Sequence, residues 1–291
     1  MRIGAAFPTT EIGTDPDTIR HFATAVEDMG FDHLTAIDHV LQAGRSEDTG
    51  WRSYYTRGNM FHEPFVLFGF LAAATRSIEL ATAILILPQR PAVLVAKQAA
   101  ELDLLSAGRL RLGVGIGWNA LEFDALGQNF RNRGRRIEEQ VEVMRLLWTQ
   151  DLVTFEGEWH RISDAGINPL PVQQPIPLWF GAFEEPAIRR AGRLGDGWYL
   201  NPRLVPGDEV RHAIGVFHTA AAEAGRATDG LGIDATLHVG SRTPADCGDL
   251  FKQWCDLGVS HVTIRTMYSD LDSPSEHLRV LEAVHAACVA P

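Results

Sequence analysis

Residues 78–118 read IELATAILILPQRPAVLVAKQAAELDLLSAGRLRLGVGIGW and contain one complete unit of the pattern that repeats along this chain. An apolar run over residues 78–85 is followed by helical spacing of apolar residues over 91–105, and then by a second apolar run over 109–114. Short apolar runs bounded by turn residues indicate buried strands. Because strand–helix–strand units cross over in the right-handed sense, this segment predicts two parallel strands with a helix packed on them.

The same alternation extends in both directions. We expect eight strands, at residues 2–7, 33–37, 78–85, 109–114, 177–180, 197–200, 233–239 and 261–265. We expect helices at residues 15–29, 64–75, 91–105, 135–148, 185–194, 206–224, 244–257 and 274–287. Eight such units close into a (β/α)8 TIM barrel, here a single domain over residues 1–291. An open doubly wound sheet needs a glycine-rich turn after its first strand, and residues 8–11, PTTE, lack one.

Two connections are longer than ordinary loops, and both follow a strand at the end where barrel enzymes build their sites. Residues 38–63 are rich in glycine and aromatic residues, as expected of a lid; the aromatic residues are Trp51, Tyr54, Tyr55 and Phe61. Residues of about 118–176 form a long insertion after the fourth strand, with a helix at 135–148 and a hairpin-like stretch at 153–160.

Composition limits the function. The chain has 291 residues and a formal net charge of −11, which disfavours a nucleic-acid partner. Three cysteines without a C-x-x-C pair are typical of a reducing cytoplasm. The longest apolar run, residues 65–74, is too short to cross a membrane, and the first residues lack the pattern of a signal peptide. We therefore expect a cytoplasmic protein that acts on a small molecule.

Candidate chemistry lies at the strand ends. Asp38 and His39 follow the second strand as a carboxylate and an imidazole; the alternative is that Asp38 caps backbone amides and His39 fills a loop. Alternate glycines close the fourth strand, either because a flat ring approaches the backbone or because the barrel interior is crowded. The residues predicted to contact this ring are Gly115, Ile116, Gly117, Trp118 and Asn119.

Two further segments have a possible role in binding anions. Gly181, Ala182 and Phe183 lead into a helix whose amino-terminal amides suit a phosphate, although two glutamates follow and oppose it. The basic run at residues 131–136 suits an anionic ligand tail or is a solvated helix start. No metal site is expected, because the eleven histidines form no H-x-H, H-E-x-x-H or Cys/His cluster.

Several of these stretches together resemble the luciferase-like flavin and deazaflavin oxidoreductases, and in particular their coenzyme F420-dependent branch. The resemblance covers residues 1 to about 203, and the stretches that carry it are EDMGFDHLTAIDH (27–39), residues 78–118, RGRRIEEQVEVMRLLW (133–148) and AGRLGDGW (191–198). It implies a barrel whose cofactor ring lies across the strand ends. It also implies a supporting bulge at Thr82, Ala83 and Ile84, with a non-proline cis peptide at Ala83–Ile84, and a phosphate loop at residues 181–183.

The resemblance gives roles to the second-strand pair. Asp38 and His39 match the Asp–His pair of the F420 branch, in which the histidine lies near the reacting carbon, so His39 is the expected proton donor or acceptor. In the related F420-dependent glucose-6-phosphate dehydrogenase, a glutamate after the Gly-x-Gly of the fourth strand serves as an acid. Trp118 occupies that position here, which argues against sugar-phosphate chemistry.

We therefore expect an F420-dependent oxidoreductase that moves a hydride between the deazaflavin and an organic substrate, and the resemblance implies a homodimer. Three alternatives stay open. One is an FMN-dependent monooxygenase on the same scaffold, and another is a non-catalytic deazaflavin-binding protein. The third, a metal-dependent barrel lyase or hydrolase, is disfavoured by the histidine spacing.

Overall fold

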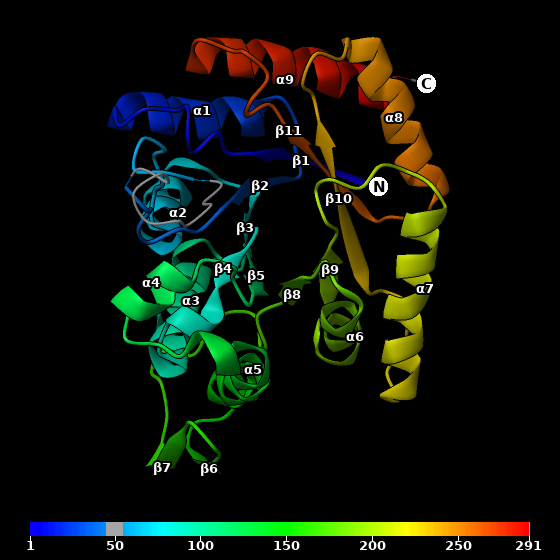
Figure 1. Cartoon of the computed structure of the whole chain (residues 1–291). Helices are drawn as coiled ribbons and strands as arrows, with labels where there is room; N and C mark the ends of the chain where they lie inside the picture. The colour runs from blue at the N-terminus through cyan, green and yellow to red at the C-terminus, as the bar shows by residue number, and fades with distance from the viewer. Residues whose placement is uncertain (45–54, 291) are drawn as a thin grey trace.

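The computed structural model describes residues 1–44 and 55–290, and its closed parallel barrel confirms the predicted fold class. The barrel strands are β1 (Arg2–Ala6), β2 (His33–Ala36), β3 (Glu79–Thr82), β4 (Leu85–Ile86), β5 (Leu110–Gly115), β8 (Leu178–Gly181), β9 (Gly197–Tyr199), β10 (Gly232–His238) and β11 (His261–Arg265). Their pairings are parallel, and contact between β3 and β5 closes the sheet (Figure 1). β3 and β4 are the two parts of one interrupted barrel strand.

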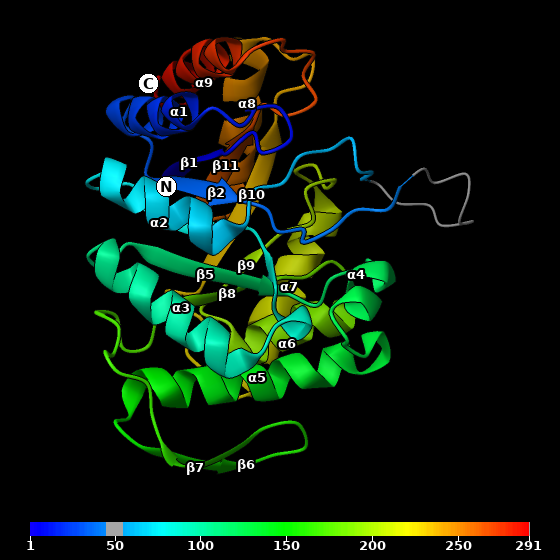
Figure 2. The same cartoon turned by 90° about the vertical axis from the view of Figure 1, so that its left-hand side faces the viewer.

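Helices surround the barrel (Figure 2). They are α1 (Pro16–Asp28), α2 (Pro64–Ala74), α3 (Ala92–Leu105), α5 (Arg133–Thr149), α6 (Glu185–Leu194), α7 (Asp208–Glu223), α8 (Pro244–Asp256) and α9 (Pro274–Val289). Four start at a proline preceded by a side chain that accepts a hydrogen bond from the first turn; these caps are Asp15, Glu63, Thr243 and Ser273. Within residues 1–44 and 55–290, no helix is long and apolar enough to cross a membrane.

The third predicted strand is interrupted. It was expected to run through residues 78–85, but β3 ends at Thr82 and β4 begins at Leu85. The break contains the Ala83–Ile84 peptide, which is cis, as the resemblance implied. A buried hydrogen bond from Thr82 Oγ1 to the Gly113 carbonyl, 2.7 Å long, ties the end of β3 to β5.

The long connection between β5 and β8 contains α4 (Ala120–Ala125), a 3-10 turn η2 (Phe130–Asn132), α5, β6 (Val153–Glu156) and β7 (Arg161–Ala165). The expected hairpin is present as β6 and β7, which lie beside α5 away from the barrel (Figure 2). Glu139 of α5 anchors it, because its carboxylate accepts hydrogen bonds from the amides of Glu158, Trp159 and His160 at 2.7–2.9 Å. The same carboxylate contacts Nδ1 of His160 at 2.7 Å.

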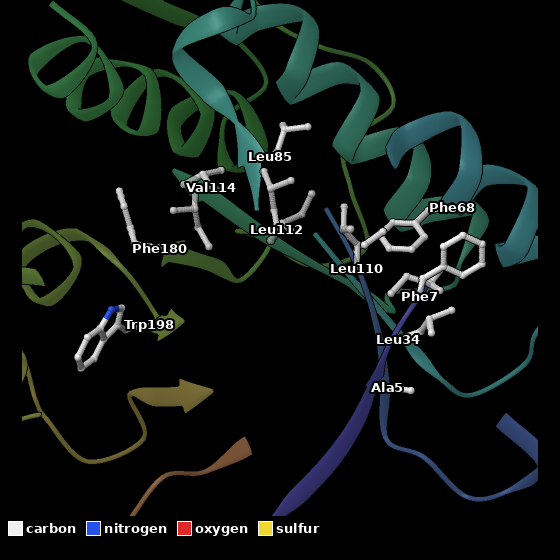
Figure 3. Packing of buried hydrophobic residues seen from close by; sticks show 14 of the residues in the cluster. Ala5, Phe7, Leu34, Phe68, Leu85, Leu110, Leu112, Val114, Phe180 and Trp198 are labelled. Carbon is white, nitrogen blue, oxygen red and sulfur yellow. The ribbon is translucent and has the colours of Figure 1, made fainter. Parts of the chain in front are cut away.

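Between the strands and the helices lies an apolar core (Figure 3). Leu110, Leu112 and Val114 alternate along β5, as expected of a strand that buries one face against helices. All three are at most 1% exposed, and so is Phe68 of α2. This layer holds the helices in place around the sheet.

The inside of the barrel is polar, which the sequence did not lead us to expect. The guanidinium of Arg111 is buried there, with its Nε 2.5 Å from Glu79 and its Nη1 3.4 Å from Asp234. It also lies 4.3 Å from the centre of the Trp179 ring. Burial opposes the charge, but the neighbouring carboxylates hold the pKa of Arg111 above its ordinary value. The charge is therefore kept inside the barrel by its partners.

Glycines on the strands make room for this interior. A Cβ atom at Gly4 would lie 2.1 Å from the imidazole of His33, and one at Gly232 would lie 2.0 Å from the indole of Trp179. Neither distance is possible without movement of a buried ring. Glycine at these positions is therefore required by large side chains that cross the barrel, and one of these, His33, contacts Asp234 at 3.3 Å.

The interior network makes a first prediction. Burial opposes the ionised form of Asp234, but His33 and Arg111 lower its pKa to about 2. Asp234→Asn should remove a charge on which Arg111 depends and lower the free energy of unfolding by about 3 kcal/mol. Urea denaturation measures this change. The exposed Asp249→Asn is the control and should change it by less than about 0.5 kcal/mol; an equally small effect at Asp234 would contradict this view of the interior.

Candidate active site

Asp38 follows β2 and joins two neighbouring parts of the barrel rim. Its Oδ2 accepts a hydrogen bond from the Ile86 amide of β4 at 2.9 Å, and its Oδ1 accepts one from Arg90 Nη2 at 2.8 Å. Arg90 in turn donates to Glu63 at 3.0 Å. Burial raises the pKa of Asp38, while Arg90 opposes that rise. These contacts make Asp38 a support for the strand segment that follows the Ala83–Ile84 bulge.

His39, the next residue, contacts a carboxylate that sequence analysis missed. Its Nδ1 lies 3.2 and 3.1 Å from the two carboxylate oxygens of Glu122, which is on α4. Figure 2 shows α4 at the end toward which the β5 arrow points, where the active sites of barrel enzymes are found. Nε2 of His39 forms no hydrogen bond with the residues described here.

Glu122 is fully buried and accepts several hydrogen bonds. Its Oε1 accepts hydrogen bonds from the amides of Val40 at 2.8 Å and Leu41 at 3.3 Å. Its Oε2 accepts one from Gln89 Nε2 at 3.3 Å. Burial works to raise the pKa of Glu122, but the hydrogen bonds from His39, Val40 and Gln89 hold it below the ordinary value. The lowered pKa favours the ionised form of this buried carboxylate.

Aromatic rings surround the His39 imidazole. The ring centres of Phe61, Tyr55 and Trp118 lie 4.9, 5.1 and 5.6 Å from it. Tyr55 and Phe61 belong to the predicted lid, so this part of the lid does lie at the site. Trp51 and Tyr54, also assigned to the lid, are outside the described residues.

Tyr55 also interacts with residues at and after the end of β11, which lies two strands from β2 in the barrel. Burial raises the pKa of the Tyr55 hydroxyl. Tyr268 raises it further, whereas Arg265 lowers it. Arg265 is the last residue of β11, and its guanidinium lies 5.2 Å from the centre of the Tyr268 ring. The lid tyrosine thus connects the loop after β2 with the end of β11.

Ile84 brings together three of the segments assigned to the cofactor. A Cβ atom at Gly115 would lie 2.6 Å from Cδ1 of Ile84, and one at Gly181 would lie 2.9 Å from its Cγ2. The Ile84 side chain therefore occupies the space that glycine leaves on both β5 and β8. The Ile84 side chain leaves no room for a Cβ atom at Gly115 or Gly181, which explains why both are glycines. Ile84 is in turn held between the ends of β5 and β8.

The other residues assigned to the ring lie just after β5. Gly117 has φ = 70°, a left-handed conformation that favours glycine, and its carbonyl accepts a hydrogen bond from Arg133 Nε at 3.2 Å. Ile116 packs against the core. Asn119 is 1% exposed, and its Oδ1 has no hydrogen-bond partner within the described residues. A buried carbonyl oxygen without a partner is a candidate acceptor for a hydrogen bond from a ligand or a water.

The segment after β8 has the expected strand-to-helix geometry. Ala182 is buried and its carbonyl accepts a hydrogen bond from Trp198 Nε1 at 2.9 Å, whereas Phe183 is 57% exposed. Glu184, which precedes α6, makes no side-chain hydrogen bond to the first turn. The amides at the start of α6 are thus not capped by that carboxylate.

Most arginines of the basic run at residues 131–136 form ion pairs or hydrogen bonds with other groups of the chain. Arg135 pairs with Glu158 at 3.3 Å, Arg136 donates to Gln128, and Arg133 donates to Gly117 and Phe130. α5 begins at Arg133, which agrees with the interpretation of this run as a helix start.

A cavity of about 330 Å³ adjoins His39, and its other lining residues include Phe61, Glu63, Gln89 and Arg90. Within the described ranges, no three or more His, Cys, Asp or Glu side chains are grouped so as to hold a metal ion.

The sequence contained only a weak signal for Glu122. It stands four residues after Trp118, about one helical turn beyond the position at which the related dehydrogenase carries its glutamate. Nothing local marks it, because its partner His39 is 83 residues away in the chain.

The chain is a TIM barrel with a buried histidine–carboxylate pair at the carboxyl ends of its strands, the end at which barrel enzymes build their active sites. The sequence model of the luciferase-like monooxygenase family matches residues 1–284, and the chain belongs to that family.

Similar proteins use more than one cofactor. An uncharacterized protein of Mycobacterium tuberculosis is 34% identical over 228 residues, 78% of this chain and 77% of that protein. An F420-dependent glucose-6-phosphate dehydrogenase of Segniliparus rotundus is 35% identical over 63% of this chain and 52% of its own length. An FMNH2-dependent dimethylsulfone monooxygenase of Pseudomonas putida is 34% identical over 76% of this chain and 58% of its own.

Solved structures share the fold. An F420-dependent secondary alcohol dehydrogenase has a TM-score of 0.77 at 20% identity, with 99% of each chain covered. The FMN-bound oxygenating component of 3,6-diketocamphane monooxygenase from Pseudomonas putida has a TM-score of 0.74 at 16% identity, covering 100% of this chain and 99% of that one.

The position of Ile84 makes a second prediction. Gly115→Ala should lower the free energy of unfolding by about 1–3 kcal/mol, because its Cβ would overlap with the Ile84 side chain. Ile84→Val removes the nearest atom, Cδ1, so the double variant should be more stable than the sum of the single effects implies. Gly69→Ala on α2, where nothing lies within 4 Å, is the control and should not destabilise. Strict additivity of the first two changes would contradict the contact.

Proposed function

We propose that this protein is an F420-dependent oxidoreductase that moves a hydride between the deazaflavin and an organic substrate. The observation that carries the proposal is His39, held on Glu122 at the barrel rim, with aromatic rings around it and with no hydrogen bond at Nε2 from residues 1–44 or 55–290. A relative that is 35% identical bears the name of an F420-dependent dehydrogenase, which supports the same cofactor.

The residues at the rim fit such a cofactor. Two buried polar atoms near the strand ends have no hydrogen-bond partner in the described part of the chain. They are Oδ1 of Asn119, after β5, and Oγ1 of Thr9, after β1. Buried polar atoms of this kind cost free energy unless a ligand or water satisfies them. Their positions after β1 and β5 favour a polar ring system across the strand ends, with Ile84 as its support.

The phosphate of the cofactor would be held by the backbone of Gly181, Ala182 and Phe183 and by the start of α6. Glu184 does not cap the helix with its side chain, but Pro186 has no N–H and the amides of Ala187 and Ile188 donate to the Glu184 carbonyl. An anion in this segment would therefore be held by the amides that precede Pro186.

When bound, F420 supplies a carbon that accepts or gives a hydride. The protein positions the substrate and moves the accompanying proton. His39 exchanges that proton at Nε2, and Asp38 supports the bulge through the Ile86 amide. Tyr55, Phe61 and Trp118 exclude water from the imidazole, which strengthens its electrostatic interactions.

An FMN-dependent monooxygenase is the second candidate, because a relative that is 34% identical is named for FMNH2. A non-catalytic deazaflavin-binding protein is the third, and slow turnover with every substrate despite tight cofactor binding would favour it. The match of Asp38–His39 to the pair of the F420 branch supports the first candidate, and the titration and turnover measurements below separate the three.

The cofactor assignment is tested by titration. We expect F420 to bind more tightly than FMN when absorption and fluorescence changes are recorded side by side at equal protein concentration. FMN binding more tightly than F420 would overturn the proposal.

The role of His39 is tested by substitution. His39→Ala should lower turnover by about 10²- to 10⁴-fold, the usual contribution of acid–base catalysis, with a much smaller change in cofactor affinity. Steady-state kinetics and cofactor titration separate the two effects. The exposed His212→Ala is the control and should match the wild type. Wild-type turnover in the His39 variant would make the imidazole a structural loop residue.

A further inference from the structure

We propose that Glu122 is a positioning residue that fixes the His39 imidazole as its Nδ1–H tautomer and so leaves Nε2 as the proton-exchanging atom. The catalytic consequence rests on the proposed function, whereas the tautomer itself does not. No feature of the second-strand pair reveals this role, because the carboxylate comes from the connection after β5.

The tautomer follows from the donors and acceptors. Both carboxylate oxygens of Glu122 lie within 3.2 Å of His39 Nδ1. An ionised carboxylate only accepts hydrogen bonds, so the hydrogen must be on Nδ1. The amides of Val40 and Leu41 and the lowered pKa of Glu122 agree with the ionised form.

The pair is also held rigidly. Glu122 is fully buried, and the His39 side chain is only 7% exposed. The Val40 and Leu41 amides fix Oε1, and Gln89 lies against Oε2. Rings of Phe61 and Trp118 pack at the imidazole, so rotation away from Glu122 would require the cluster to move. A fixed tautomer is what a single proton-exchanging nitrogen requires.

A purely structural role for Glu122 is the competing explanation. In that case the carboxylate only anchors the loop after β2 through the Val40 and Leu41 amides, and the tautomer of His39 is independent of it. The two explanations differ in what happens to the imidazole when the charge is removed and the shape is kept.

The chain offers a matched control at the hairpin. Glu139 contacts Nδ1 of His160 at 2.7 Å and accepts three backbone amides, in the same manner as Glu122 but away from the barrel rim. Glu139→Gln therefore tests the effect of losing a Glu–His pair as such.

The experiment is two-dimensional ¹⁵N–¹H NMR of the histidine rings in cofactor-free protein at pH 9, where an ordinary imidazole is neutral. The His39 signal is assigned by its loss in His39→Ala. We expect the wild type to show a protonated Nδ1 and an unprotonated Nε2. Glu122→Gln should lose this preference, and Glu139→Gln should keep it for His39 while changing the His160 signal. A protonated Nε2 in the wild type, or an unchanged His39 signal in Glu122→Gln, would overturn the proposal.

Turnover provides a second test. Because Glu122 acts through His39, Glu122→Gln should lower turnover by about 10²-fold or more without weakening F420 binding comparably. Adding it to His39→Ala should then cause no further loss, whereas a structural role predicts an additional loss. Failure of F420 to bind would refute the proposed function but not the tautomer, which the wild-type spectrum decides without cofactor.

Discussion

The polar interior of the barrel is organised around a buried cation, the guanidinium of Arg111. A cation inside a barrel is stable only if its partners are also inside, and Glu79 and Asp234 come from β3 and β10, on either side of the interior. Cross-barrel partners of this kind specify which strands face each other. The network lies near the amino-terminal halves of β3 and β5, so the carboxyl ends are left for a different use.

At those carboxyl ends, two buried carboxylates organise the rim. Asp38 accepts a hydrogen bond from the Ile86 amide and so holds the second part of the interrupted third strand. Glu122 contacts His39 and accepts a hydrogen bond from the amide that follows it, that of Val40. Ile84 is positioned between β5 and β8 by the glycines that face it. The candidate site is therefore assembled from segments that follow different strands, which explains how a barrel can keep its scaffold while its loops change function.

The periodic part of the sequence predicted most of the fold, because strand–helix alternation and the proline-marked helix starts are local signals. The resemblance, rather than periodicity, predicted the cis peptide at Ala83–Ile84. Glu122 and the Arg111 network were not predictable in the same way, because their partners lie far apart in the chain and burial of a charge is visible only in three dimensions. Gly115 shows the limit of local inference, since it accommodates the chain's own Ile84.

A crystal structure of the protein with F420 bound would test the central claim most directly, because it locates the cofactor relative to His39 and Glu122 at once. We expect the deazaflavin ring across the strand ends, supported by Ile84, with its reacting carbon on the side of His39 Nε2 and with Nδ1 still on Glu122. A ring bound away from Ile84, or a His39 that has turned from Glu122 to the cofactor through Nδ1, would contradict the proposed site.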